Sequence, residues 1–317
     1  MNKDEQAKKI KIIFIGTADF GLPSLDALIA DPSYQLLAVI TSPDKATGRH
    51  QLLTPSPIKI LALKYKLPIL QPKKIGEITE KIKLLKPDLI IVIAYKQLLP
   101  PAILAIPPFG CLNIHPSLLP KYRGAAVVQA AILNYEQNTG ITIFKMDEGL
   151  DSGPILAQSK IKISANETSG SLYHKLANLA GKFLPSVLEK YLAGKIEPLL
   201  QDRSQASYLG KLTKADGLID WSKPANEIAT QIRAMMPWPL AWTWWQGRQI
   251  KILEVQQQTI GINSYKVGKT FKYNNGLAVQ TGHDVLIIRK LQLEGKKVLT
   301  SEDFIRGQRD FIGAILG

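Results

Sequence analysis

Short apolar runs alternate with segments of helical spacing along the first 100 residues of the chain. The apolar runs are rich in β-branched residues and are bounded by turn residues, as in buried strands. Strands are expected at 10–16, 36–41 and 87–95, with helices at 22–30, 56–66 and 74–86. Strand and helix that alternate in this way are typical of an open α/β sheet. We therefore predict a mostly parallel, Rossmann-like sheet for this part of the chain.

The pattern changes twice in the second half of the chain. A strand is expected at 155–163, and residues 164–195 have the spacing of one long helix with an apolar, core-facing stripe. Periodicity is then lost, and short strand candidates separated by glycine-containing turns follow. Such candidates are typical of a small β-barrel. We predict a first domain at 1–195, a linker at 196–207 and a small OB-like β-barrel domain at 208–317.

Polar side chains interrupt the apolar pattern at the end of one predicted strand. Asn113 and His115 are two residues apart, so a strand directs both to the same face, and Pro116 then ends the strand. Asp151 lies in a loop between Gly149 and Gly153. Asn, His and Asp side chains that converge at a strand end can transfer protons and stabilise the intermediate of an acyl transfer. The alternatives are a hydrogen-bonded structural histidine and an aspartate that only shapes a turn.

Composition restricts the class of protein and its partners. The 317 residues are 45% hydrophobic and 21% charged, as in ordinary globular proteins. The formal net charge of +14 favours a polyanionic partner, a nucleic acid or an anionic membrane surface. One cysteine permits no internal disulfide, and one cysteine with four scattered histidines argues against a metal cluster. No signal core and no membrane-spanning apolar run are expected, so we predict a cytoplasmic protein.

The sequence lacks the motifs of two classes of nucleotide-binding protein. The first strand is followed by GTADFG, which is not the G-x-G-x-x-G turn of dinucleotide-binding sheets, and no lysine follows a glycine-rich loop as in a P-loop. Neither a dinucleotide nor ATP is therefore the expected ligand.

Several motifs in fixed order resemble one enzyme family. N-x-H at 113–115 is followed by SLLPKYRG and then by a D-x-G-x-D-x-G loop at 147–153. This combination resembles the folate-dependent formyltransferases, and supporting segments such as TSPDKATGR and MMPWPLAW extend the resemblance over nearly the whole chain. It implies a formyltransferase fold, with Asn113, His115 and Asp151 as the catalytic set. It also implies that Ser117, Leu118, Leu119 and Pro120 form part of the folate pocket.

The resemblance also implies a reaction and its partners. The formyl donor is 10-formyltetrahydrofolate, a co-substrate, and the acceptor is the amino group of methionine carried on initiator methionyl-tRNA. No metal is implied, and we expect a monomer. A formyltransferase for a small amine, such as glycinamide ribonucleotide or an amino-sugar nucleotide, would share the same catalytic motif. A nucleic-acid-binding module on an inactive sheet is the non-enzymatic alternative, which the intact Asn113, His115 and Asp151 disfavour.

Basic positions are the candidates for tRNA contacts. Residues 42–57 are rich in proline and lack periodicity, so a solvated surface loop is one interpretation. In the tRNA-acting members of the family the matching loop reaches toward the acceptor end of the tRNA, which implies roles for Lys45 and Arg49. Lys45 stands where a relative has Arg, His50 begins a less basic run, and Lys96 stands where glycine is frequent beside the pterin pocket. Residues 208–317 carry ten Lys and five Arg against five Asp and four Glu, a net charge of +6, which suits a phosphate backbone.

Overall fold

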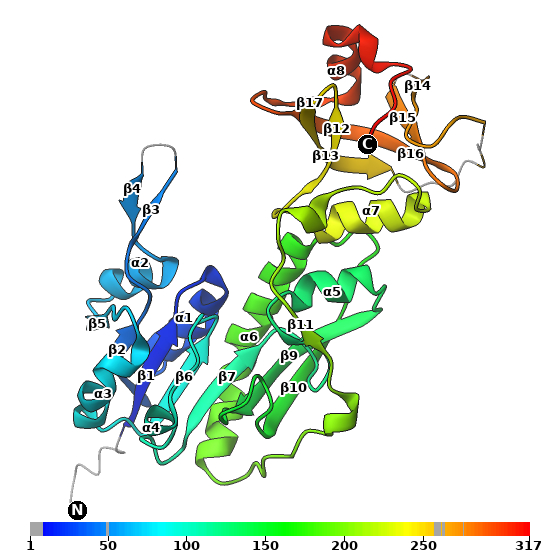
Figure 1. The fold of residues 1–317 in the computed structure, drawn as a ribbon. Coiled ribbons are helices and arrows are strands. Elements are labelled where there is room, and N and C mark those ends of the chain that lie inside the picture. Colours follow the sequence, from blue (N-terminus) through cyan, green and yellow to red (C-terminus); the bar gives the residue numbers. More distant parts are fainter. Residues whose placement is uncertain (1–8, 49–50, 257–260, 262–263, 275) are drawn as a thin grey trace, which may run out of the picture. The chain divides into compact units, whose positions relative to one another are not determined.

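The chain folds into two compact units. The computed structural model describes residues 9–48, 51–256, 261, 264–274 and 276–317 (Figure 1). The first unit contains Met1–Val127, Asn138–Lys162 and Tyr173–Leu209, and the second contains Val128–Gln137, Ile163–Leu172 and Gly210–Gly317.

A seven-stranded sheet forms the centre of the first unit. Its strands are β1 (Ile10–Gly16), β2 (Tyr34–Ile40), β5 (Ile69–Leu70), β6 (Leu89–Ile93), β7 (Cys111–His115), β9 (Asn138–Lys145) and β10 (Ile155–Lys162). They lie in the order β10-β9-β7-β6-β1-β2-β5. The five strands from β7 to β5 pair in parallel, whereas β9 is antiparallel to both β7 and β10. The prediction of an open, mostly parallel α/β sheet is confirmed.

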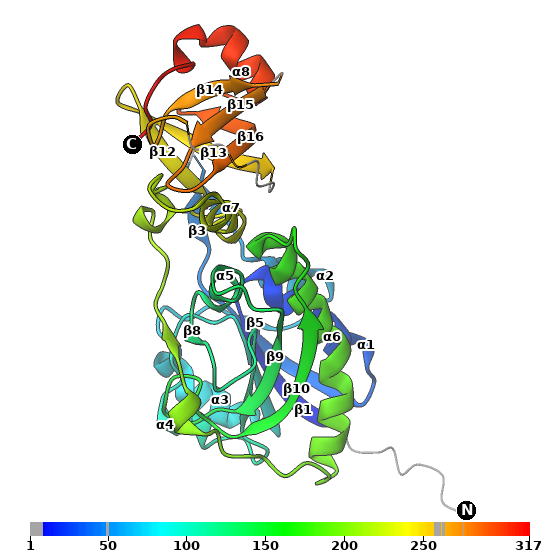
Figure 2. The same cartoon turned by 90° about the vertical axis from the view of Figure 1, so that its right-hand side faces the viewer.

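Helices cover both faces of this sheet (Figure 2). The helices outside the C-terminal region are α1 (Leu22–Ala30), α2 (Pro57–Lys64), α3 (Thr79–Leu85), α4 (Pro101–Leu104), α5 (Val127–Leu133) and α6 (Ser169–Leu192), with 3-10 turns η1 (Asp19–Gly21), η2 (Ile75–Ile78) and η3 (Arg203–Gln205). Ile82 of α3 and Ile103 of α4 join the core cluster that contains Ile13 and Ile90 of the central strands. All five residues of β6 are buried, as expected for a parallel strand covered on both sides.

The segment expected to be an irregular loop contains a small hairpin. β3 (Lys45–Thr47) pairs antiparallel with β4 (Leu52–Thr54). The side chains of Leu52 and Leu53 are 67% and 75% exposed. Because β4 buries neither face, its sequence shows no alternation of apolar and polar residues, and the periodicity could not reveal it. Arg49 and His50, two of the positions singled out in the sequence, lie outside the described residues.

The base of the hairpin is fixed by a carboxylate. Lys59 Nζ lies 2.6 Å from Asp44 Oδ2, and Gln71 Nε2 donates to Asp44 Oδ1 at 2.8 Å. The hydrogen bond from Lys59, followed by that from Gln71, lowers the pKa of the Asp44 carboxyl from its ordinary value. Asp44 thus joins the entry of the hairpin to α2 and to the residue after β5.

The second unit is built on an antiparallel sheet. Its strands are β12 (Ala241–Trp245), β13 (Arg248–Gln256), β14 (Thr270–Tyr273), β15 (Gly276–Gln280), β16 (Val285–Leu293) and β17 (Val298–Thr300), and its helical elements are α7 (Ala225–Ala234), α8 (Ser301–Gly307), η4 (Ala215–Gly217) and η5 (Arg309–Phe311). The order is β12-β13-β16-β15-β14, with β17 paired to β16. Trp221 and Trp245 are buried in its core cluster, whereas Trp238 and Trp244 are 51% and 41% exposed. The prediction of a C-terminal β domain is confirmed. Within the described ranges, no helix has both the length and the apolarity required to cross a bilayer.

Close packing of α6 against α1 yields a stability prediction. A Cβ at Gly181 would lie 2.6 Å from Pro23 Cβ and 2.7 Å from the Pro23 carbonyl oxygen. Alanine favours a helix by about 1 kcal/mol over glycine. Overpacking a filled site costs about 1–3 kcal/mol, and here the contact includes backbone that cannot rotate away. Gly181→Ala should therefore lower the free energy of unfolding, by up to about 2 kcal/mol, measured by chemical denaturation.

Gly307→Ala is the matched control, because a Cβ at Gly307 would meet no atom within 4 Å. This variant should be as stable as the wild type or slightly more stable. Equal stability of the two variants would contradict the steric explanation at Gly181.

Candidate active site

The end of β7 carries the Asn and His predicted from the sequence. Asn113 pairs with Val92 of β6 and with Phe144 of β9, and His115 pairs with Thr142. Two positions apart on one strand, both side chains project from the same face of the sheet. The His115 side chain is 6% exposed, and Asn113 is half-buried. Among the described residues, the Asn113 amide has no hydrogen-bonding partner, so it is available to a ligand.

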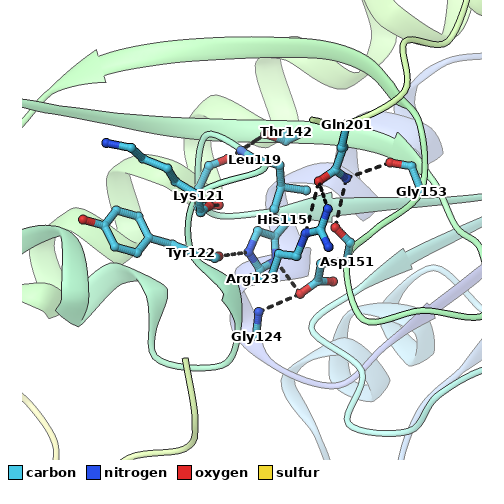
Figure 3. Close-up of polar contacts among 11 residues, drawn as sticks. His115, Leu119, Lys121, Tyr122, Arg123, Gly124, Thr142, Asp151, Gly153 and Gln201 are labelled. Carbon is cyan, nitrogen blue, oxygen red and sulfur yellow. Dashed lines mark hydrogen bonds and ion pairs between the residues drawn. The ribbon is translucent and has the colours of Figure 1, made fainter. Parts of the chain in front are cut away.

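Asp151 lies in the loop between β9 and β10 and faces His115. Its Oδ2 is 3.6 Å from His115 Nδ1, and the Asp151 side chain is 13% exposed (Figure 3). The same oxygen accepts the backbone N–H of Gly124 at 2.8 Å. Asp151 has a φ of 51°, in the left-handed region that non-glycine residues adopt rarely. The sequence predicted that these three side chains converge, and the structure brings His115 and Asp151 together beside Asn113.

A backbone carbonyl fixes the other side of the imidazole. His115 Nε2 lies 2.8 Å from the carbonyl oxygen of Tyr122, so the ring nitrogen is the donor in this hydrogen bond. Nδ1 faces the Asp151 carboxylate. The Nδ1–Oδ2 distance of 3.6 Å is longer than a hydrogen bond, so Nδ1 is directed at the carboxylate without being bonded to it. The imidazole is thus held through Nε2, with Nδ1 and the Asp151 carboxylate facing each other.

A second, two-stranded sheet fixes the segment that contacts both residues of the pair. β8 (Arg123–Gly124) pairs in parallel with β11 (Tyr208–Leu209). Gly124 has a φ of 104°, and a Cβ there would lie 2.2 Å from the Leu209 carbonyl oxygen, so only glycine allows this approach. The chain from 201 to 209, which overlaps the segment predicted as a linker, thus lies against the site.

Sequence reasoning missed two side chains in this region, Arg123 and Gln201. Arg123 is 2% exposed and donates to Gln201 Oε1 from Nε and Nη2, at 3.2 and 2.7 Å. Its Nη1 donates to the Tyr208 hydroxyl at 2.8 Å. Arg123 stood inside the quoted SLLPKYRG motif, but Gln201 lay in an aperiodic polar stretch that carried no signal for a site.

The four residues predicted for the folate pocket connect His115 to Tyr122. Ser117 and Leu119 are buried, and Thr142 fixes them: its hydroxyl donates to the Ser117 carbonyl at 2.7 Å and accepts the Leu119 N–H at 3.1 Å. The Ser117 hydroxyl donates to a backbone carbonyl at 2.9 Å. Leu118 and Pro120 are half-buried. Of this set, Leu118 and Pro120 therefore retain surface for a ligand.

Other candidate residues fall into distinct environments. Lys45 is exposed on β3, and Lys96 is exposed after β6. The hydroxyl of Tyr95, beside Lys96, is buried without a partner among the described residues, and burial raises its pKa. Burial likewise raises the pKa of the Cys111 thiol to about 12, which leaves it protonated. In the part of the chain that the structure describes, no group of three or more His, Cys, Asp or Glu side chains is arranged to hold a metal ion.

Solved structures of similar fold are formyltransferases. An N-formyltransferase from Helicobacter canadensis, solved in complex with folinic acid and dTDP-3-aminofucose, is 20% identical. Its TM-score is 0.67, over 88% of this chain and 99% of that one. WlaRD, described as a sugar 3N-formyl transferase, is 22% identical with a TM-score of 0.66, over 92% of this chain and 100% of that one. At this level of identity the similarity shows the fold.

Sequence relatives are about twice as identical to this chain as those solved structures are, and two family models match it. The methionyl-tRNA formyltransferase of Methylacidiphilum infernorum is 43% identical over 97% of this chain and 98% of that relative. The protein of the same name from Bacillus velezensis is 37% identical over 97% of this chain and 98% of its own length. The model described as "Formyl transferase" matches residues 8–188, and that described as "Formyl transferase, C-terminal domain" matches residues 211–309. These matches show that the chain belongs to the formyl transferase family.

Proposed function

We propose that this enzyme transfers the formyl group of 10-formyltetrahydrofolate to the α-amino group of methionine on initiator methionyl-tRNA, for translation initiation. The observation that carries the proposal is identity of 37–43% to proteins named methionyl-tRNA formyltransferase, over nearly the full length of both chains. Such an enzyme acts in the cytoplasm, and a monomer is the expected state.

The half-buried amide of Asn113 and the imidazole of His115 suit the addition step. A free α-amino group has a pKa near 7.7 and must lose its proton before it attacks the formyl carbon. Attack converts the formyl oxygen into an oxyanion. The unpartnered Asn113 amide can donate to that oxygen, the type of contact that stabilises a tetrahedral intermediate. His115 can add a second donor only through Nδ1, because Nε2 already donates to the Tyr122 carbonyl.

His115 and Asp151 suit the proton transfers that the reaction requires. The new C–N bond forms to the methionine amine, and the bond from the formyl carbon to tetrahydrofolate breaks. In the net reaction one proton leaves the attacking amine and one is taken up by the departing tetrahydrofolate nitrogen. Asp151, 3.6 Å from His115 Nδ1, can accept the first proton directly or through water, and the imidazole can supply the second.

The loop after β7 is our proposed folate contact. Leu118 and Pro120 offer apolar surface, whereas the polar groups of Ser117 and Leu119 hold the loop in place.

Charge favours a tRNA acceptor over a small amine. Residues 208–317 have a net charge of +6, fifteen basic against nine acidic side chains, which suits a phosphate backbone. Lys45 on the exposed hairpin and Arg49, outside the described residues, are the proposed tRNA contacts of the first unit. The alternative acceptor is a small amine, such as glycinamide ribonucleotide or an amino-sugar nucleotide. The sugar formyltransferases support only a common fold, because their identity is 20–22%.

A transfer assay tests the proposal directly. Labelled formyl from 10-formyltetrahydrofolate is followed onto charged initiator tRNA, with glycinamide ribonucleotide and an amino-sugar nucleotide in parallel. We expect transfer to the charged tRNA alone. Transfer only to a small amine would refute the tRNA assignment, and no transfer to any acceptor would refute the proposed reaction.

Removing single groups of the site should lower the turnover number. Asn113→Ala removes one oxyanion donor, which typically costs roughly 10² to 10³ in kcat. Asp151→Asn removes the carboxylate that faces His115, and its kcat should fall by a similar factor, about 10² or more. Steady-state formylation of charged tRNA measures both effects.

Asp147→Asn is the matched control in the same loop. Asp147 Oδ1 accepts the Ser152 hydroxyl at 2.7 Å, and an asparagine keeps an oxygen there. Its kcat should stay within about threefold of the wild type, as is usual for an exposed substitution. If Asp151→Asn retained wild-type kcat, its assignment to the reaction would be wrong.

Neutralising the hairpin lysine should weaken tRNA use but not folate use. Lys45→Ala should raise the KM for charged tRNA severalfold, leave the KM for 10-formyltetrahydrofolate unchanged, and reduce the slope of log K against log salt by about 1 if Lys45 contacts one phosphate. Lys81→Ala, at an exposed position of α3, is the control and should change neither constant. Wild-type behaviour of Lys45→Ala would support the interpretation of residues 42–57 as a solvated surface segment.

A further inference from the structure

The side chain of Gln201 contacts two backbone carbonyls of the loop that carries Asp151. Its Nε2 donates to the Asp151 carbonyl oxygen at 2.9 Å and to the Gly153 carbonyl oxygen at 2.7 Å. A primary amide has two N–H donors, and these two carbonyls use both. Gln201 therefore bridges the backbone of the very residue whose carboxylate faces His115 (Figure 3).

Arg123 holds the other end of the same amide. Its Nε and Nη2 both donate to Gln201 Oε1, and its Nη1 donates to the hydroxyl of Tyr208. Among the described residues, no Asp or Glu side chain pairs with this buried guanidinium. A cation on Oε1 polarises the amide and strengthens its two N–H donors, because hydrogen bonds in series reinforce one another.

The loop needs an external support of this kind. Asp151 has a φ of 51°, a backbone conformation that costs on the order of 1 kcal/mol or more for a residue with a side chain. Such a conformation persists only where the surroundings impose it. Within the loop itself, Asp147 accepts only the N–H of Gly149 and the hydroxyl of Ser152. One bond from Gln201 acts directly on the Asp151 carbonyl and the other on the Gly153 carbonyl, so together they resist rotation of the backbone at Asp151.

We propose that Gln201 is a positioning residue for formyl transfer: locked by Arg123, it holds the Asp151 backbone so that the carboxylate faces His115. The inference rests on the proposed function, since it acts through Asp151. Tyr208 and the β8–β11 pairing complete the arrangement, because they fix Arg123 and Gly124 on the opposite side of the carboxylate.

The variant that separates positioning from packing is Gln201→Glu. A glutamate has the same shape and still accepts from Arg123, but it cannot donate to the two carbonyl oxygens. A displacement of a reacting group by about 1 Å lowers the reaction rate roughly 10²-fold. We therefore expect kcat to fall about 10- to 100-fold, with the KM values for folate and charged tRNA within about threefold of the wild type. Gln205→Glu is the matched control: it lies in the same segment, is exposed, and contacts only Asp202 through its side chain, so it should retain wild-type constants.

A double-mutant cycle tests whether Gln201 acts through Asp151. In an Asp151→Asn background, Gln201→Glu should lower kcat by less than about threefold, because residues that act as a unit are not additive. The proposal would be overturned if the effects of the two substitutions on kcat multiplied. It would also be overturned if Gln201→Glu kept wild-type kcat. An inactive wild-type protein would instead refute the proposed function, so the two failures are distinguishable.

A spectroscopic readout makes the test independent of turnover. In protein labelled with 15N-histidine, the ring signals of His115 are identified by their loss in His115→Asn. Gln201→Glu should shift the Nδ1 signal in the same direction as Asp151→Asn does, and Gln205→Glu should leave it unchanged. An unshifted signal in Gln201→Glu would contradict the proposal. If Gln201→Glu fails to fold, Arg123→Lys carries the test: it keeps the charge but not the two-donor contact, and it should shift the same signal and lower kcat several-fold.

Discussion

The contact between the imidazole of His115 and the carboxylate of Asp151 is the interaction on which the rest of the site depends. The two residues are supplied by different types of structure. His115 ends a strand that is fixed by pairing on both sides, whereas Asp151 lies in a loop with a left-handed backbone. The sheet determines the position of the histidine backbone. The position of the aspartate depends on contacts from elsewhere in the chain, and these contacts account for much of the polar structure around the site.

The surrounding contacts are mostly neutral hydrogen bonds to backbone groups. The Tyr122 carbonyl, the Gly124 N–H and the Gln201 amide fix the imidazole, the carboxylate and the loop backbone respectively. A buried salt bridge to either member of the pair would compete for the charge that the chemistry needs. Neutral partners restrict the geometry of His115 and Asp151 without placing another charge beside them. Arg123 is the exception, and its charge is directed onto the amide of Gln201 and onto a tyrosine hydroxyl.

Most of the fold could be predicted from the sequence because burial leaves a pattern. The strands at 10–16 and 87–95 are apolar runs because both of their faces are covered. In β10, at the sheet edge, apolar and polar residues alternate because only one face is covered. The strand β4 left no pattern because its side chains are exposed. Asn113, His115 and Asp151 stood out because polar residues end apolar strands or lie among glycines. Gln201 and Tyr208 did not, because their function depends on a pairing with Arg123 about 80 residues earlier, which no local pattern encodes.

The pairing of β8 with β11 has a consequence for how the chain can be divided and recombined. Residues 201–209 connect the two units in sequence, yet their hydrogen bonds belong to the first unit. A change of length between Gln201 and Leu209 would alter the spacing of contacts on Asp151, Arg123 and Gly124 together. Gly210 is exposed and a Cβ there would meet no atom within 4 Å. A change of chain length is therefore best tolerated after Leu209, beyond the linker that the composition of the sequence predicts at 196–207.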